Sequence, residues 1–177
     1  MKGTFLEIFI DYVQQTYGEE TALLARLNCG LKRVISTQNY PREIFSRYLQ
    51  EVKRLTGSNE AHILYNFGRS FLFTPTFQKV YHAYLYQSNL KDFILALNGI
   101  HRRFSQGASE DDKSYFTIVC EDEDKIVLRF SLSMHLCLFI KGLLESAADI
   151  FDEKVHIYKH KCNKRDNETC EIVIAYK

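Results

Sequence analysis

Tryptophan is absent from the sequence, proline occurs only twice, and no apolar run is long enough to span a membrane. A transmembrane helix needs about 18 or more consecutive apolar residues, so the composition argues against a membrane protein. An excess of one charge is also lacking, because Lys and Arg total 23 against 22 Asp and Glu, for a net charge of +1. A nearly neutral surface has no electrostatic preference for nucleic acid or for an anionic membrane.

Signatures of catalysis and of export are missing as well. The chain has no glycine-rich phosphate loop, no nucleophile elbow and no His-Glu-x-x-His sequence, so we do not expect an enzyme. Its first residues carry a single lysine and then a helical pattern with Glu7 and Asp11, which is unlike a signal peptide and indicates a cytoplasmic protein. In a reducing compartment the five cysteines are thiols or metal ligands rather than a disulfide framework.

The chain does have a high aromatic content, with 13 Phe and 11 Tyr among 177 residues. Aromatic side chains suit the wall of an apolar cavity, and they also suit an ordinary core, which composition alone favours. The overall composition, 46% hydrophobic and 25% charged, is that of a globular domain with a core of its own.

Hydrophobic periodicity predicts a succession of helices in the first part of the chain. Apolar residues recur at helical spacing from residue 5 to about residue 104. The fourth helix is expected to begin near Ser58, and the fifth to continue from Pro75 through Leu85. The segments are separated by residues that commonly begin or end helices: Gly18, Asn28-Cys29-Gly30, Pro41, Gly57, Pro75 and Asn89.

A different pattern follows a short polar segment at 106–113, which is predicted to be a loop. Strands are predicted at 115–120 and 125–130 around an acidic turn, and again at 155–158 and 171–176, with a strongly periodic helix between the two pairs. The order predicts an α+β fold, with a helical part at about 1–105 and an antiparallel sheet packed against one long helix at about 113–177. No repeat or linker interrupts the chain, so 1–177 is predicted to form one domain.

Several short motifs, taken together, resemble the haem-nitric oxide/oxygen-binding family, usually written H-NOX. They are Met1-Lys2-Gly3, Phe67-Gly68-x-x-Phe71, Lys91-Asp92-Phe93, Leu97-x-x-Ile100-His101 and Gly142-Leu143-Leu144-Glu145. Their order and spacing cover essentially the whole chain. The resemblance implies a haem-based gas sensor that signals to a separate partner, commonly a histidine kinase of bacterial two-component signalling or a cyclic-di-GMP enzyme.

His101 is the residue that the resemblance implies as the axial ligand of haem b. A neutral imidazole binds one face of a haem iron well. On spacing alone, a single histidine beside Leu97 and Phe104 is more often a satisfied core residue. The resemblance favours the ligand role.

The distal wall of the haem pocket, on the side opposite His101, would be apolar. Relatives that hold oxygen place a tyrosine where this chain has Phe139, and a phenyl ring donates no hydrogen bond to bound oxygen. We therefore expect selectivity for nitric oxide and carbon monoxide, although the same rings also suit a plain core. By the resemblance, the wall consists of Phe5, Phe9, Phe77, Phe139 and Leu143.

A propionate clamp that the family normally writes Tyr-x-Ser-x-Arg is degenerate here. Its positions hold Phe130, Leu132 and Met134, none of which can hydrogen-bond to a carboxylate. Charge-assisted hydrogen bonds of this kind contribute roughly 1.5–3 kcal/mol each, so their loss weakens haem binding strongly. The nearest cations in sequence are Arg129, Arg102, Arg103 and His135. The simpler alternative is an apolar core that holds no haem.

Three cysteines and a histidine form a second candidate site. Cys162 and Cys170 flank a polar segment between two predicted strands, His160 lies two residues before Cys162, and Cys137 lies on the long helix. Three thiolates and one imidazole make a closed tetrahedral zinc site, and the resemblance implies zinc because some relatives carry it at the corresponding cysteines.

His160 is offset by one position, because the histidine of those relatives corresponds to Lys159 here. His135 or His156 are the alternatives to His160. Cysteines in a hairpin are also often simple thiols, and Cys29 and Cys120 are predicted to be such thiols.

Two hypotheses follow from these patterns. The first is a haem-dependent sensor in which nitric oxide competes with or breaks the bond to His101 and thereby releases the helix that carries it. The second is a haem-free interaction or redox-sensing module on the same fold, with a structural zinc site.

Overall fold

The computed structural model describes residues 1–105, 115–122, 124–131, 136–162 and 169–177. Within these ranges, residues 100–105, 115, 116, 131, 159–162 and 169 are described by their backbone alone. None of the described helices combines the length and the hydropathy that crossing a membrane requires.

Helices fill the first part of the chain, as predicted. They are α1 (Gly3–Tyr17), α2 (Glu19–Asn28), α3 (Arg42–Thr56), α4 (Glu60–Ser70), α5 (Pro75–Tyr81) and α6 (Leu90–Ser105), with 3-10 turns η1 (Phe71–Phe73) and η2 (His82–Leu85). Gly18 and Gly57 follow α1 and α3 with φ of 92° and 67°, a conformation that glycine adopts without strain.

Two helix boundaries differ from the prediction. The N-cap of α4 is Asn59 rather than Ser58, because the Asn59 side chain accepts a hydrogen bond from the Ala61 N–H at 2.8 Å. The fifth helix does not continue through Leu85 but breaks into α5 and η2 after Tyr81. Periodicity alone does not distinguish an α-helix from a 3-10 turn of similar spacing.

The second part of the chain is an antiparallel sheet with one long helix, which confirms the predicted fold class. Its strands are β1 (Tyr115–Glu121), β2 (Lys125–Ser131), β3 (Val155–Cys162) and β4 (Thr169–Tyr176), in the order β1-β2-β4-β3. Helix α7 (Cys137–Ile150) connects β2 with β3. Cys162 and Cys170 were expected to flank a polar segment between strands at 155–158 and 171–176, and both strands are longer than predicted and include them.

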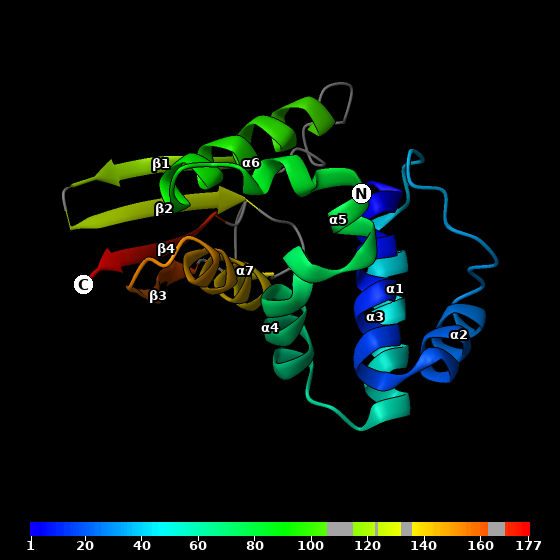
Figure 1. Cartoon of the computed structure of the whole chain (residues 1–177). Coiled ribbons are helices and arrows are strands. Elements are labelled where there is room, and N and C mark those ends of the chain that lie inside the picture. The colour runs from blue at the N-terminus through cyan, green and yellow to red at the C-terminus, as the bar shows by residue number, and fades with distance from the viewer. Residues whose placement is uncertain (106–114, 123, 132–135, 163–168) are drawn as a thin grey trace.

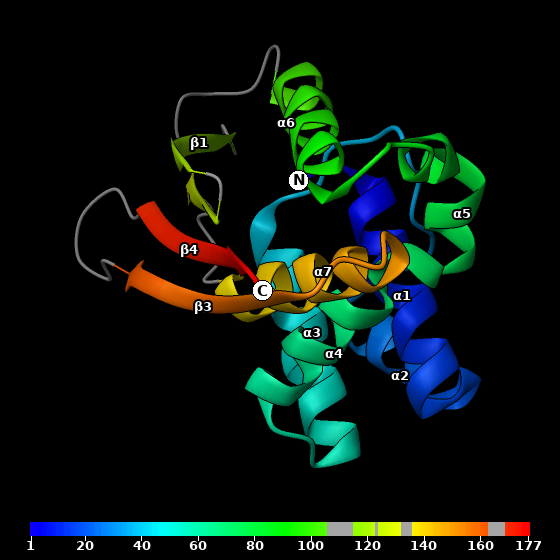
Figure 2. The ribbon, with the colours of Figure 1, turned by 60° about the vertical axis from the view of Figure 1, so that its left-hand side comes forward.

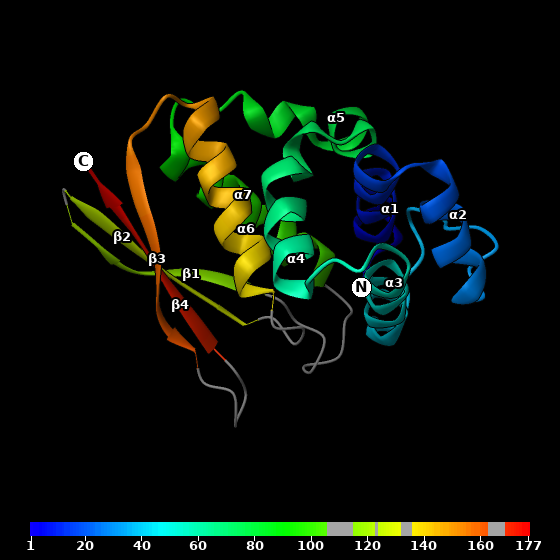
Figure 3. The ribbon, with the colours of Figure 1, turned by 90° about the horizontal axis from the view of Figure 1, so that it is seen from below.

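The elements form layers, with the sheet at one end and α1, α2 and α3 at the other (Figures 1 and 3). Helix α7 packs against β3, and α6 packs against β1 (Figure 2). Every second residue of β2 and β4 is buried toward these helices, namely Ile126, Leu128, Phe130, Cys170, Ile172 and Ile174. One buried cluster joins this inner face to the helical part.

Helix α4 lies between the two parts and touches α7 backbone to backbone. A Cβ atom added to Gly68 would lie 2.1 Å from the Phe139 carbonyl oxygen, and one added to Gly142 would lie 2.3 Å from the Tyr65 carbonyl oxygen. Around this contact, the Tyr65 hydroxyl donates to Glu145 Oε2 at 2.6 Å, and that hydrogen bond raises the pKa of Tyr65. These contacts fix α7 along α4.

Replacing Gly68 with Ala should lower the free energy of unfolding by about 1–3 kcal/mol or more, because the new methyl group meets backbone atoms that cannot turn aside. Gly99→Ala is the matched control. Gly99 is an exposed residue of α6 with nothing within 4 Å of an added Cβ, so alanine there should stabilise by about 0.5–1 kcal/mol. Urea unfolding midpoints measure both, and equal midpoints for the two variants would refute the close contact.

Candidate functional site

His101 lies in the last part of α6 (Leu90–Ser105), where the structure describes its backbone. The helix starts at an Asn89 cap, whose side chain accepts the Asp92 N–H at 2.8 Å, as the sequence predicted. Leu90, Phe93 and Ile94 bury the apolar side of the helix, and half-buried Leu97 continues it. Because His101 follows Leu97 by one helical turn, it belongs to the same side of α6.

Two contacts from other parts of the chain hold the start of α6. The Glu153 carboxylate accepts the Leu90 N–H at 2.9 Å, and the Lys91 ammonium pairs with Glu121 of β1. An anion at a helix N-terminus is favourable because the free N–H groups and the helix dipole are positive there. The first turn of α6 is therefore tied both to the segment after α7 and to the sheet.

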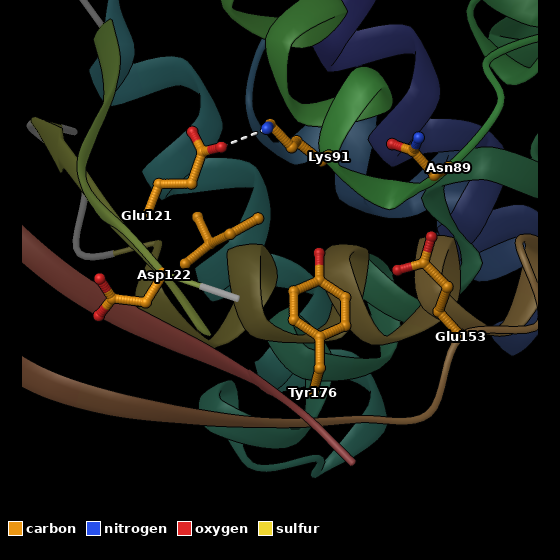
Figure 4. A pocket seen from close by; sticks show the side chains of 7 residues that line it. Asn89, Lys91, Glu121, Asp122, Glu153 and Tyr176 are labelled. Atoms are coloured by element: carbon orange, nitrogen blue, oxygen red, sulfur yellow. Dashed lines mark hydrogen bonds and ion pairs between the residues drawn. The ribbon is translucent and has the colours of Figure 1, made fainter. Parts of the chain in front are cut away.

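These groups line a pocket of about 370 Å³, together with Asp122 and the apolar side chain of Ile126. Figure 4 shows Lys91 and Glu121 joined across one side of it, with Glu153 and the Tyr176 ring on the other. Burial, and then the charges of Glu153 and Glu121, raise the pKa of Tyr176. The pocket thus lies at the anchored end of α6, away from His101.

The predicted distal wall is assembled as a cluster of aromatic rings. Phe139 of α7 lies 5.6 Å from Phe5 of α1, measured between ring centroids. Phe9 and Phe77 are buried at 0% and 1% exposure, and Leu143 follows Phe139 on α7 with 4% exposure. All of the predicted wall residues therefore belong to one apolar region between α1, α5 and α7.

Phe67 and Phe71 also belong to this cluster of rings, although the sequence analysis quoted them only as a family motif. Their ring centroids lie 4.8 Å and 5.2 Å from that of Phe139. Their spacing of one helical turn, next to Gly68, was the signal in the sequence that could have placed them against α7.

Phe130 is buried on the inner face of the sheet at 1% exposure. In the sheet register it pairs with Phe116 on one side and with Cys170 on the other. A phenyl ring supplies no hydrogen bond there. The other two positions of the degenerate clamp, Leu132 and Met134, lie outside the described residues.

Arg129 does not replace the missing clamp. It is exposed, and its guanidinium donates two hydrogen bonds to Glu171 Oε1, at 2.9 Å from Nε and 2.7 Å from Nη2. Strand alternation turns Arg129 to the face opposite Phe130. Of the other cations, His135 lies outside the described residues, and the side chains of Arg102 and Arg103 are not described.

The structure brings together two of the predicted zinc ligands. The Cys137 thiol donates a hydrogen bond to Cys170 Sγ at 3.1 Å, between the first residue of α7 and β4. Cys162 pairs with Cys170 in the register of β3 and β4. His160 belongs to β3 by its backbone, and its side chain is not described.

The proposed substitute His156 does not reach this site. It is exposed, its ring packs 5.4 Å from that of Tyr158, and its neighbour Ile157 occupies the inner face instead. Among the side chains that the structure describes, no group of three His, Cys, Asp or Glu residues is placed to bind a metal ion.

The two remaining cysteines lie apart from these thiols. Burial raises the pKa of the Cys29 thiol, and a hydrogen bond to Asp122 raises that of Cys120. A raised pKa lowers the thiolate fraction, which agrees with their prediction as ordinary thiols.

The described residues fit one part of a haem and not another. The apolar side of α6 and the ring cluster match the hydrocarbon face of a porphyrin. In addition, Asn98, one turn before His101, has a buried Oδ1 that accepts no hydrogen bond from the described part of the chain. An imidazole that binds a metal usually donates its other N–H to such an acceptor. The propionates find no partner at Phe130.

Comparison with solved structures identifies the fold. The structure matches an oxygen-binding H-NOX domain related to soluble guanylate cyclases, in its oxygen complex, with a TM-score of 0.89 and 18% identity, over 100% of this chain and 95% of that one. It matches the I5F mutant of T. tengcongensis H-NOX with a TM-score of 0.86 and 19% identity, over 100% and 98%. It also matches a Cs H-NOX mutant with a TM-score of 0.86 and 18% identity, over 100% of this chain and 97% of that one. The fold is that of H-NOX domains.

The family follows from the sequence itself. The family model described as Haem-NO-binding matches residues 2–159, so this chain belongs to the H-NOX family, whose members generally are haem-based gas sensors. A search of curated proteins found no match. Neither the family nor the described structure points to a catalytic activity.

Glu153→Ala should weaken the anchor of α6, because it leaves the Leu90 N–H without its acceptor. We expect a loss of about 1 kcal/mol of local stability. Amide hydrogen exchange at Leu90 should accelerate by the corresponding factor. Lys91→Ala breaks an exposed ion pair. It should change the opening free energy obtained from this exchange by less than about 0.5 kcal/mol. An unchanged Leu90 rate in Glu153→Ala would show that Glu153 is not an anchor.

Proposed function

We propose that this protein is a haem-dependent sensor of nitric oxide and carbon monoxide, with His101 as the axial ligand of haem b. The observation that carries the proposal is that His101 follows half-buried Leu97 by one turn of α6, in a chain whose family binds haem. The buried acceptor of Asn98 one turn earlier supports this role. Haem would supply an iron that binds diatomic gases.

The gas selectivity follows from the distal wall. Phe139 and the rings around it are apolar, and none of them donates a hydrogen bond. Bound oxygen needs such a donor to be held stably, whereas nitric oxide and carbon monoxide do not. Leu143 extends the same apolar surface along α7.

Signalling in this proposal is a movement of α6. The helix is tied at its start by Glu153 and Glu121, whereas His101 lies near its other end. Loss of the bond to His101 on nitric oxide binding would free that end while the start stays anchored. A partner protein that binds α6 differently before and after this movement would respond to it. The partner we propose is a histidine kinase or a cyclic-di-GMP enzyme.

Hemin titration of the purified protein tests the proposal. The wild type should develop a Soret band and form stable complexes with nitric oxide and carbon monoxide, but no stable oxygen complex in air. His101→Ala should weaken hemin binding by at least about tenfold, since even changes around a metal ligand cost 10- to 100-fold.

His62→Ala is the matched control, because His62 is exposed on α4 and its ring contacts Asn66. It should bind hemin as the wild type does. A colourless wild type that ignores hemin would contradict the proposed cofactor. An oxygen complex that persists in air would contradict the selectivity alone.

A second candidate is a haem-free interaction or redox-sensing module with a structural zinc. The contact of Cys137 Sγ with Cys170 Sγ favours it, together with Cys162 opposite Cys170 in the sheet. Cys137, Cys162 and Cys170 would supply thiolates, and His160 the imidazole, of a tetrahedral site.

Elemental analysis tests this candidate. The wild type grown with zinc should contain about one zinc per chain, as expected for a closed four-ligand site. Cys170→Ser should lose it, because the substitution removes the thiolate at the centre of the group. Cys120→Ser is the control and should keep its zinc, since Cys120 is not one of the proposed ligands. It lies on β1, where its thiol donates a hydrogen bond to Asp122. Zinc-free wild type, or zinc retained in Cys170→Ser, would refute the site.

A further inference from the structure

Helix α2 exposes a group of leucines instead of burying them. Leu23, Leu24 and Leu27 are 43%, 39% and 55% exposed. Because Leu27 follows the other two by one helical turn, the three side chains share one face of the helix. Single exposed apolar residues are common on any protein, but three that adjoin on a helix of 10 residues are typical of a surface that binds another apolar surface.

The opposite face of α2 already has its partners within the domain. Helix α2 packs against α1 and α3, and Ala22 and Ala25 are buried. The Tyr48 hydroxyl of α3 donates a hydrogen bond to the Ala22 carbonyl oxygen at 3.2 Å, and the Asn28 side chain donates one to Glu51 at 3.0 Å. These contacts fix the rotation of α2 about its own axis, so the leucines cannot turn inward.

The charges of α2 run from acidic to basic along the helix. Glu19 and Glu20 lie in its first turn, and Arg26 lies in its last turn. None of the three belongs to an ion pair between described residues, and the buried Nε of Arg26 has no hydrogen-bond partner among them. Glu19 and Arg26 are seven residues apart, so they flank the leucine face on the same side.

This arrangement is complementary to itself. An antiparallel second copy of α2 sets the acidic end of each helix against the basic end of the other, and it also opposes the two helix dipoles favourably. A partner of one charge sign would instead meet like charge at one end of α2. The charge pattern therefore favours a second copy of this chain as the molecule that covers the leucines.

We propose that two copies of this chain associate through α2, as a symmetric dimer whose twofold axis passes close to Leu23. In that register Glu19 of one copy lies within reach of Arg26 of the other, and the symmetry repeats the pair. Leu23, Leu24 and Leu27 of the two copies cover one another between these pairs. An apolar centre with a charged rim is the usual anatomy of a protein interface.

The contact is small, so the dimer should be weak. A helix of 10 residues is about 15 Å long. Interfaces that bury less than about 1,200 Å² in total are typical of transient association. We therefore expect a dissociation constant in the micromolar range and an exchange between monomer and dimer.

Such a dimer would keep the candidate haem site accessible. Helix α2 lies at the end of the molecule opposite the sheet (Figures 1 and 3), whereas α6 packs against β1 of that sheet. Association through α2 would therefore leave both α6 helices free to contact a partner. The inference itself needs neither haem nor zinc.

Sedimentation equilibrium of the full chain tests the dimer. The average mass should rise from one chain toward two with increasing concentration. Leu27→Lys should raise the dissociation constant by at least about tenfold, because symmetry places the new charge in the apolar face twice. Leu95→Lys is the matched control, since Leu95 is 48% exposed on α6, and it should dimerise as the wild type does.

Two results would overturn the dimer. One is a wild type that remains monomeric at about 1 mM, where any specific association is negligible in energy. The other is a Leu95→Lys variant that dissociates as readily as Leu27→Lys. Circular dichroism should show both variants folded, because both leucines are exposed.

Charge reversal tests the antiparallel pairing. Glu19→Lys and Arg26→Glu should each weaken self-association, because each sets like charges against one another at both ends. Mixed in equal amounts, the two variants should form a heterodimer in which every pair is again acid against base. Glu43→Lys is the control, since Glu43 is an exposed acid in the first turn of α3, and it should dimerise normally. A mixture that remains monomeric would overturn the proposed pairing.

A different occupant of the leucine face would be recognised with the same variants. If the wild type remains monomeric but binds phosphatidylcholine vesicles, and Leu27→Lys does not bind them, the face binds lipid and the proposed dimer is wrong. All of these measurements use protein without hemin. Their outcome is therefore separate from the success or failure of the proposed sensor function.

Discussion

The backbone contact between α4 and α7 is the constraint on which the rest of the structure depends. Gly68 and Gly142 let the two helices approach until a methyl group has no room. That contact fixes α7 along α4, and α7 packs in turn against β3. Everything that α7 carries then has a fixed place, including Cys137 beside β4 and Phe139 among the rings of the helical part.

Helix α6 is attached in a different way. Asn89 caps its first turn, Glu153 accepts a hydrogen bond from its first N–H group, and Lys91 pairs with Glu121. The polar contacts thus lie at one end of the helix. His101 lies toward the other end, on the apolar side. A helix held firmly at one end and bound at the other through a single ligand is suited to convert the loss of that ligand into a rotation. In the proposed function the two helices would have distinct roles, with α7 carrying the fixed ring cluster and α6 acting as the moving part.

Much of the fold was predictable because its signals are local. Gly18, Gly57 and the cap at Asn89 act within one helical turn, and strand alternation extends over a few residues. The row through Phe130 and Cys170 was not predictable, because strand register depends on pairing between distant segments. The sequence also offered Arg129 as a carboxylate partner, although strand alternation already places it on the face opposite Phe130. Its pairing with Glu171 of the distant strand β4 could not be predicted. The contact of Cys137 with Cys170 likewise depends on where α7 docks.

The central claim is that iron is held mainly by His101 and an apolar cavity, without hydrogen bonds from β2 to the acid groups of the porphyrin. A crystal structure of the protein grown with hemin tests it most directly. The account predicts His101 bound to iron, the ring of Phe139 on the opposite side, and propionates that receive nothing from Phe130. A structure from such crystals with no porphyrin between α6 and α7, and with protein side chains filling that space, would contradict the account.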